Sequence, residues 1–177
     1  MSRQPRDPNK MSEVTKFKRE IIKKLYNSPD IIELLDCPDV DPESPDSAEW
    51  TCIFPYIRIP DIQESIANYI GVKVDTESYP ENGLYKEATI VISIICALPT
   101  LHAEGYKGIR TDIIGGDITE ILNWNDTMGF TIRLVEEIEG VFENFNYYYR
   151  NLRFTALKNN DVPNGNNRHQ GKRRIIE

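Results

Sequence analysis

The segment from Tyr85 to Leu98 is apolar at most positions, and it constrains the fold more than any other part of the chain. A strand here would carry apolar side chains on both of its faces: Ile90, Ile92, Ile94 and Cys96 on one, and Val91, Ile95 and Ala97 on the other. A strand with one solvated face alternates apolar and polar residues, whereas a strand buried on both faces does not. The segment therefore predicts a central strand that is covered on both sides.

Apolar residues spaced three and four apart predict three helices, which begin near Glu13, Asp30 and Tyr106. Gly115 and Gly116 in the third helix indicate close packing on the sheet or a local kink, because each costs roughly 1 kcal/mol relative to alanine. Alternating or β-branched residues predict four further strands, at Thr51–Ile59, Ser65–Asp75, Phe130–Val135 and Tyr147–Leu157. Two acidic segments lack such patterns: we expect a loop without core residues at Cys37–Glu49 and irregular backbone at Glu136–Asn146.

The expected order of elements is α-α-β-β-β-α-β-β. This order predicts an α+β fold in which helices pack on one face of a mainly antiparallel sheet. The length of 177 residues fits one domain of ordinary size plus tails. We expect an extended N-terminal arm at 1–11, a single domain at 12–157 and a basic C-terminal tail at 158–177.

The charge of the chain is distributed unevenly. Residues 1–24 carry a net charge of +5 and residues 158–177 a net charge of +3, whereas residues 25–157 carry −15. A nucleic-acid-binding domain normally presents a basic face, so we expect this acidic body to repel DNA. The basic ends could meet an acidic neighbour, including a second copy of the chain, or could stay solvated.

The sequence does not predict a membrane segment, a secretory signal or a metal site. No apolar run is long enough to span a bilayer, and the polar start at Met1 is unlike a secretory signal. Cys37, Cys52 and Cys96 are far apart, and the two histidines do not complete a zinc site. The acidic loop lacks the glycine and final glutamate of an EF-hand. We therefore expect no membrane segment, no metal and no cofactor.

The sequence also lacks common catalytic motifs. It has no P-loop, no GxGxxG after a strand and no GxSxG. Pro60-Asp61 resembles the start of a nuclease PD-(D/E)xK motif, but no glutamate in the chain is followed two residues later by lysine. His102, just after the long apolar segment, is a possible catalytic base, but a lone histidine is more often a surface residue. We therefore expect a protein that is not an enzyme.

Two segments resemble a known family. One is Phe54–Gln63, FPYIRIPDIQ, followed by an Ile-x-Val-x-Val strand, and the other is Gly108–Asp117, GIRTDIIGGD. Over about residues 51–157, these segments and the order of elements are similar to neck proteins of tailed phages that infect Firmicutes, above all to the tail terminator or tail-completion family. The resemblance implies a ring, most often a hexamer, of α+β subunits that caps the tail tube.

The resemblance also implies where the protein works and what it contacts. It implies a structural virion protein at the head–tail junction, assembled in the host cytoplasm. Its partners would be other copies of the chain, the tail tube protein and the head-closure or connector protein, with DNA passing through the lumen without specific binding. An acidic lumen wall would let DNA slide, and the acidic candidates are Glu136, Glu137 and Glu139 together with the loop 39–49.

Candidate interface residues lie at the start of the third helix and in the C-terminal tail. Arg110 and Asp112 are two residues apart and do not face each other, so we expect one of them to reach another element or subunit. The tail contributes Arg168, Lys172, Arg173, Arg174, Ile175 and Ile176. Both arms lack the apolar content to fold alone, so we expect them to become ordered only against acidic residues of an adjacent subunit or ring.

Three alternatives remain open. The chain could be a head-closure or adaptor protein of a neighbouring ring, although the former are mostly small β-barrels and the latter mostly helical. It could be a small acidic binding module or inhibitor that mimics nucleic acid. It could also be a small hydrolase that uses His102 with nearby acids.

Overall fold

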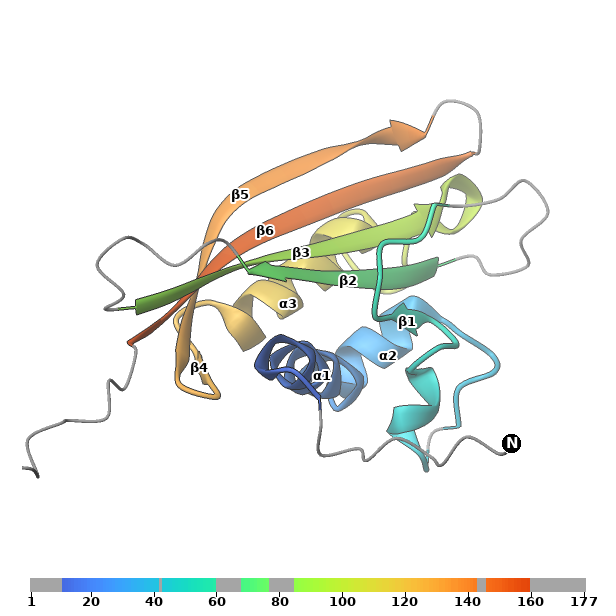
Figure 1. The fold of residues 1–177 in the computed structure, drawn as a ribbon. Coiled ribbons are helices and arrows are strands. Elements are labelled where there is room, and N and C mark those ends of the chain that lie inside the picture. The colour runs from blue at the N-terminus through green and yellow to red at the C-terminus, as the bar shows by residue number, and fades with distance from the viewer. Residues whose placement is uncertain (1–10, 42, 60–67, 77–84, 143–145, 160–177) are drawn as a thin grey trace, which may run out of the picture.

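Three α-helices cover one face of a six-stranded sheet in the computed structural model, which describes residues 11–41, 43–59, 68–76, 85–142 and 146–159 (Figure 1). The helices are α1 (Glu13–Tyr26), α2 (Pro29–Leu35) and α3 (Arg110–Leu122). The strands are β1 (Ile53–Phe54), β2 (Asn68–Thr76), β3 (Tyr85–Ala97), β4 (Asp126–Thr127), β5 (Phe130–Phe142) and β6 (Tyr147–Asn159). This arrangement confirms the predicted α+β class.

The order of strands across the sheet is β1-β2-β3-β6-β5-β4. All neighbouring strands in this order pair antiparallel except β1 and β2, which pair parallel. β6 is paired on one side with β3 and on the other with β5. The sheet is therefore mainly antiparallel, as the sequence predicted, and its longest strands lie at its centre.

The prediction of a central strand at 85–98 is confirmed, because β3 lies between β2 and β6. Ile90, Ile92 and Ile94 are fully buried on the helix side. On the other side Ile95 is buried and Val91 is half-buried. Full burial of one such side chain contributes roughly 1.5–3 kcal/mol, so β3 is a major part of the core.

α1 begins and ends close to where its apolar spacing predicts. The Ser12 hydroxyl accepts a hydrogen bond from the Thr15 backbone N–H at 3.2 Å, which makes Ser12 an N-cap. The buried stripe consists of Phe17, Ile21, Ile22 and Leu25. Phe17 stacks on Phe130 at the start of β5, with ring centroids 4.4 Å apart, so this stripe joins the helix to the sheet.

β2 is buried on both faces where it passes β1. A Cβ on Gly71 would lie 2.8 Å from the carbonyl oxygen of Tyr56, because the segment that leaves β1 crosses this position. Glycine is the residue that permits such a close backbone approach. The alternation of residues 65–75 predicted the strand, but it did not predict the crossing segment.

The predictions for residues 37–59 are wrong in two places. Only Ile53 and Phe54 of the expected strand at 51–59 pair with β2, since Pro55 follows directly and has no N–H to continue the ladder. The acidic loop does contain core residues, because Val40 and Ala48 are buried. A short 3-10 helix at Pro45–Ala48 turns Ala48 inward.

Three further boundaries differ from the predictions. β5 does not become irregular at Glu136 but continues to Phe142, because β6 supplies backbone partners along that stretch. α3 begins at Arg110 rather than near Tyr106, since Gly108 has a φ of 121° that a helix cannot contain. Lys158 belongs to β6 rather than to the tail, and its Nζ lies 2.8 Å from Glu13 Oε1.

Candidate functional site

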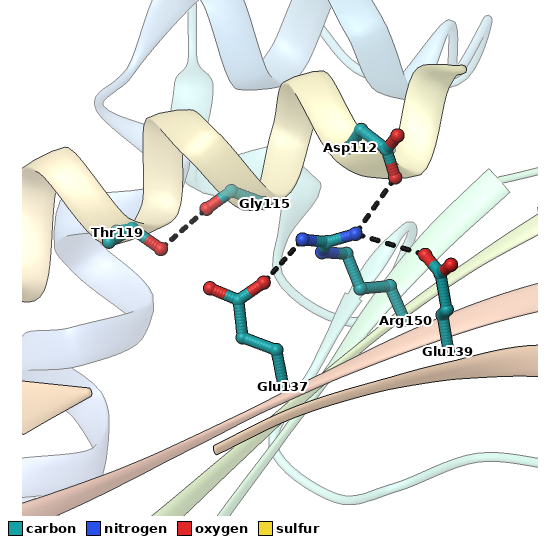
Figure 2. Close-up of polar contacts among 6 residues, drawn as sticks. All are labelled: Asp112, Gly115, Thr119, Glu137, Glu139 and Arg150. Atoms are coloured by element: carbon teal, nitrogen blue, oxygen red, sulfur yellow. Dashed lines mark hydrogen bonds and ion pairs between the residues drawn. The ribbon is translucent and has the colours of Figure 1, made fainter. Parts of the chain in front are cut away.

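Arg150 on β6 gathers three carboxylates from α3 and β5 (Figure 2). Its Nη1 lies 2.9 Å from Asp112 Oδ1 and 3.1 Å from Glu139 Oε2, and its Nη2 contacts Glu137 Oε2. One guanidinium therefore serves three carboxylates, which leaves a surplus of two negative charges. We call these four residues the Arg150 cluster.

The register between β5 and β6 places the Arg150 cluster on the helix side of the sheet. Glu139 lies directly opposite Arg150, and Glu137 lies opposite Leu152, the next residue of β6 on the same face. Asp112 is in the first turn of α3, where the helix dipole favours a carboxylate. Figure 2 shows the Asp112 carboxylate directed from the helix toward the guanidinium.

Gly115 makes room for the Arg150 side chain beneath α3. A Cβ at position 115 would lie 3.0 Å from Arg150 Nε, which is tighter than ordinary van der Waals contact. The Gly115 carbonyl accepts a hydrogen bond from the Thr119 hydroxyl at 2.8 Å (Figure 2). Of the two glycines, Gly115 is the one at the sheet, since a Cβ on Gly116 would meet open space.

The ion pairs of the Arg150 cluster are partly solvated. The carboxylate side chains are between 37% and 52% exposed, so each pair contributes on the order of 0–1 kcal/mol. Tyr148 lies beside the cluster, and its pKa is raised first by burial and then by a hydrogen bond to Glu139. The cluster therefore acts as a set of positioned surface charges that connect α3 to the β5–β6 hairpin.

The three predicted lumen glutamates do not share one face of the sheet. Glu137 and Glu139 lie on the helix side, whereas Glu136 lies on the opposite side with its Oε2 3.5 Å from Arg153 Nη1. Arginines partly neutralise all three. The three glutamates therefore do not form one continuous acidic surface. Most acidic residues of the loop 39–49, the other predicted lumen segment, are exposed.

Arg110, a predicted interface residue, is used inside the fold. Its side chain is buried, and its guanidinium donates to the carbonyl of Leu34 near the end of α2 and, through Nε, to the carbonyl of Thr100 at 2.8 Å. A cation at a helix C-terminus satisfies a carbonyl that has no partner within the helix. Arg110 and Asp112 do point to different elements, as their spacing predicted, but both elements belong to the same chain.

Asp112, the second predicted interface residue on α3, belongs to the Arg150 cluster. The predicted tail residues lie outside the described residues: Arg168, Lys172, Arg173, Arg174, Ile175 and Ile176. Sequence reasoning also missed Arg150 and Arg153. The charge pattern of β6 gave no signal for them, because their carboxylate partners come from other elements.

A second surface runs along α1 and combines exposed aromatic residues with cations. Trp50 and Tyr56 are exposed, and their ring centroids lie 6.2 Å apart. They border an open groove that is also lined by Lys18 and Arg19 of α1. Sequence reasoning missed this surface because its aromatic and basic residues are about 30 positions apart in the chain.

The groove is held in shape by two local features. Lys18 Nζ donates a hydrogen bond to the Pro55 carbonyl at 2.7 Å, which joins α1 to the segment after β1. Trp50 has a φ of 71°, an uncommon conformation for a bulky residue, and its backbone N–H bonds to the Ile53 carbonyl at 3.0 Å. The turn therefore projects the indole outward.

The cysteines and His102 differ in their exposure. Cys52 and Cys96 are buried; burial raises the pKa of Cys96 to about 12 and also raises that of Cys52. His102 is exposed. Within the described ranges, no three potential metal ligands lie together. No helix of that same part of the chain has the length and apolar content to cross a membrane.

Comparison with known protein families finds a match over most of the chain. The YomW family model matches residues 20–156. The chain belongs to the YomW family. The matched region of this YomW-family protein contains the whole Arg150 cluster. It also contains Arg110 and the carbonyls to which Arg110 donates hydrogen bonds.

A solved structure shares the fold of the YomW-family chain. It is a chain of the "Virion of native gene transfer agent (GTA) particle", with a TM-score of 0.55 and 14% sequence identity. The alignment covers 83% of the present chain and 98% of the matched chain. At this identity the likeness establishes a common fold. No curated protein matches the sequence significantly.

Proposed function

We propose that this YomW-family protein is a structural protein of a phage-type virion and is not an enzyme. The single observation that carries the proposal is the fold it has in common with a chain of a gene transfer agent virion. Because the alignment covers 98% of that chain, the likeness extends over nearly all of it. The family match over residues 20–156 begins within α1 and ends within β6.

Our finer proposal is a tail terminator, a hexameric ring between the tail tube and the head connector. Of the two segments that resemble this family, one begins at the last residue of β1, and the other spans the start of α3. The layout of helices on one face of a mainly antiparallel sheet supports a terminator over its neighbours in the neck. Head-closure proteins are mostly small β-barrels, and adaptors are mostly helical.

DNA would pass through the lumen of this ring without being bound. The net charge of −15 on residues 25–157 supports this, because like charges keep a moving duplex from adhering to the wall. The loop 39–49 is the better lumen candidate, since most of its carboxylates are exposed. Glu136, Glu137 and Glu139 are weaker candidates because Arg150 and Arg153 neutralise part of their charge. The same pairing weakens the alternative of an inhibitor that mimics nucleic acid.

The proposal is tested in a phage or prophage whose genome encodes the chain. We expect mass spectrometry to find several copies of the protein in each purified particle. We expect a nonsense mutation in its gene to yield DNA-filled heads and separate tails in negative-stain images, and antibody labelling of intact particles to mark the head–tail junction.

Each result addresses a different level of the proposal. Absence of the protein from purified particles would overturn the structural role. Normal joining of heads and tails in the mutant would overturn the junction role. Labelling at the capsid surface or at the tail tip would overturn the position in the neck while leaving the virion role intact.

A further inference from the structure

The outer edge of β5 beyond Leu134 has no strand beside it within the described residues. β4 pairs only with the first two residues of β5, and the Asn123 side chain accepts the Leu134 N–H at 2.9 Å. Beyond this point three aliphatic side chains are about half exposed: Val135, Ile138 and Val141. We call residues 135–141 the β5 edge. An unpaired edge with exposed apolar side chains is a surface that favours association.

The β5 edge is acidic as well as apolar. It holds Glu136, Glu137 and Glu139, which together with Asp112 contact only two arginines. This part of the molecule therefore has a surplus of two negative charges. Because like charges opposite each other destabilise strand pairing, the edge would repel the same edge of a second copy. A partner surface should be basic and partly apolar.

The groove along α1 has the opposite charge. It consists of two adjoining hollows that share Met11, Arg19 and Glu49, and we call them together the α1 groove. Their charged lining residues are Lys16, Lys18, Arg19, Lys23, Glu20 and Glu49. Four cations and two carboxylates leave a surplus of two positive charges. Trp50, which is 63% exposed, forms its aromatic wall with Tyr56. Tryptophan, tyrosine and arginine are the residues that most often dominate binding at protein interfaces.

The β5 edge and the α1 groove lie at different ends of the subunit. In Figure 1 the distal half of β5 lies at the top of the view, whereas α1 lies below β2 and β3, in the lower half of the view. Contacts between two different surfaces of identical subunits are head-to-tail contacts, and they form a ring when the rotation between subunits closes.

We propose that the β5 edge of one copy docks into the α1 groove of a second copy. Val141, which shares the helix-side face of β5 with Glu137 and Glu139, would pack against Trp50 and Tyr56, while these two glutamates would face the cations of α1. Ile138 projects from the opposite face and would line the other side of the docked edge. The two surpluses of charge are equal in size and opposite in sign. This inference rests on the proposed ring and deepens it, because it names the two surfaces that would join neighbouring subunits.

A mixing experiment tests the head-to-tail geometry. The edge variant is Ile138→Arg with Val141→Arg, which places cations opposite the basic groove. The groove variant is Trp50→Gly with Tyr56→Ala, which removes the aromatic wall but keeps the cations that repel the mutated edge; glycine suits the positive φ of position 50. We expect the wild type to self-associate in sedimentation velocity, and each variant alone to do so at least about tenfold more weakly.

The mixture of the two variants gives the distinctive result. The edge variant keeps an intact groove and the groove variant keeps an intact edge, so we expect a 1:1 mixture to form heterodimers and nothing larger. Leu157→Arg, an exposed aliphatic position of β6 outside both surfaces, is the matched control and should associate like the wild type. Wild-type protein that remains monomeric up to about 1 mM would overturn the proposal. So would variants that self-associate normally or do not pair when mixed.

Cross-linking of the wild type supplies a readout that does not depend on variants. A zero-length carbodiimide joins carboxylates to lysine amines that are in contact. We expect links in the dimer band between the glutamates at 136–139 and Lys16, Lys18 or Lys23, and none in the monomer. Links from these glutamates only to other segments would overturn the proposal. Absence of the protein from virions would instead overturn the proposed function and leave a contact measured in solution standing.

Discussion

Gly115 of α3 lies against Arg150 of β6 so closely that a Cβ on the glycine would be 3.0 Å from the arginine Nε. The guanidinium passes between helix and sheet at this point. From there it reaches Asp112 on the helix and two glutamates on β5. The absence of a side chain at one position therefore allows a single arginine to connect three elements.

Alanine substitutions at the two adjacent glycines should have opposite effects. In a helix interior, replacing glycine with alanine stabilises by roughly 0.5–1 kcal/mol. We expect Gly116→Ala to raise the free energy of unfolding by about this amount, because a Cβ there meets open space. We expect Gly115→Ala to lower it by about 1 kcal/mol, because the new Cβ displaces Arg150. Urea denaturation followed by circular dichroism measures both, and an equal gain in the two variants would contradict the tight contact.

Removal of the two arginines of β6 should have unequal effects. Arg150→Met leaves three carboxylates close together without a cation, and we expect a loss of roughly 1–2 kcal/mol of unfolding free energy. Arg153→Met leaves only Glu136, and we expect a change within about 0.5 kcal/mol. High salt should recover part of the loss in Arg150→Met by screening the carboxylates. Equal losses in both variants, measured by urea denaturation, would show that Arg150 has no special role.

Arg110 should matter for stability rather than for assembly. Arg110→Met removes the donor to two carbonyls, those of Leu34 and Thr100, and each buried group left without a partner costs about 1–3 kcal/mol. We expect thermal unfolding at a clearly lower temperature with unchanged self-association of the folded protein. Arg19→Met, at an exposed position of α1, is the matched control for stability. If Arg110→Met had normal stability but no longer self-associated, Arg110 would be an interface residue, as the sequence suggested, and not a stabilising one.

The buried thiols should make the protein less stable at high pH. A thiol with a higher pKa in the folded state than in the unfolded state contributes its full stability below the unfolded pKa of about 8.5, and this contribution is lost as the pH rises toward the folded pKa. Burial raises the pKa of Cys96 to about 12. We expect the free energy of unfolding to fall above about pH 9, and Cys96→Ala to reduce that fall. Denaturant titrations at several pH values measure it, and an identical pH dependence of both proteins would refute the assignment.

The isolated protein should not hold duplex DNA. The body at residues 25–157 has a net charge of −15, and the arginines of β6 are already paired with carboxylates. We expect fluorescence anisotropy with a labelled duplex to show no binding below about 1 µM, even at low salt. A sub-micromolar affinity that falls steeply with salt would contradict an inert lumen.

The sequence by itself determined those elements in which apolar residues recur at the period of a helix or a strand. The apolar spacing in α1 and the uninterrupted apolar character of β3 each indicate which faces are buried, so these elements and the α+β class could be predicted. β5 beyond Val135 could not be predicted, because its local composition is acidic and its pairing partner is β6. The same holds for the buried Val40 and Ala48, which lie in a segment rich in proline and acidic residues.

Only the tertiary structure decided the candidate surfaces. Spacing showed that Arg110 and Asp112 diverge, but not that one reaches α2 and the other β6. The Arg150 cluster joins residues 112, 137, 139 and 150, and the α1 groove joins α1 to Trp50 and Tyr56. Charges and aromatic rings act over a few ångströms in space, whereas periodicity reports only neighbours along one element, so the fold was needed to bring these groups together.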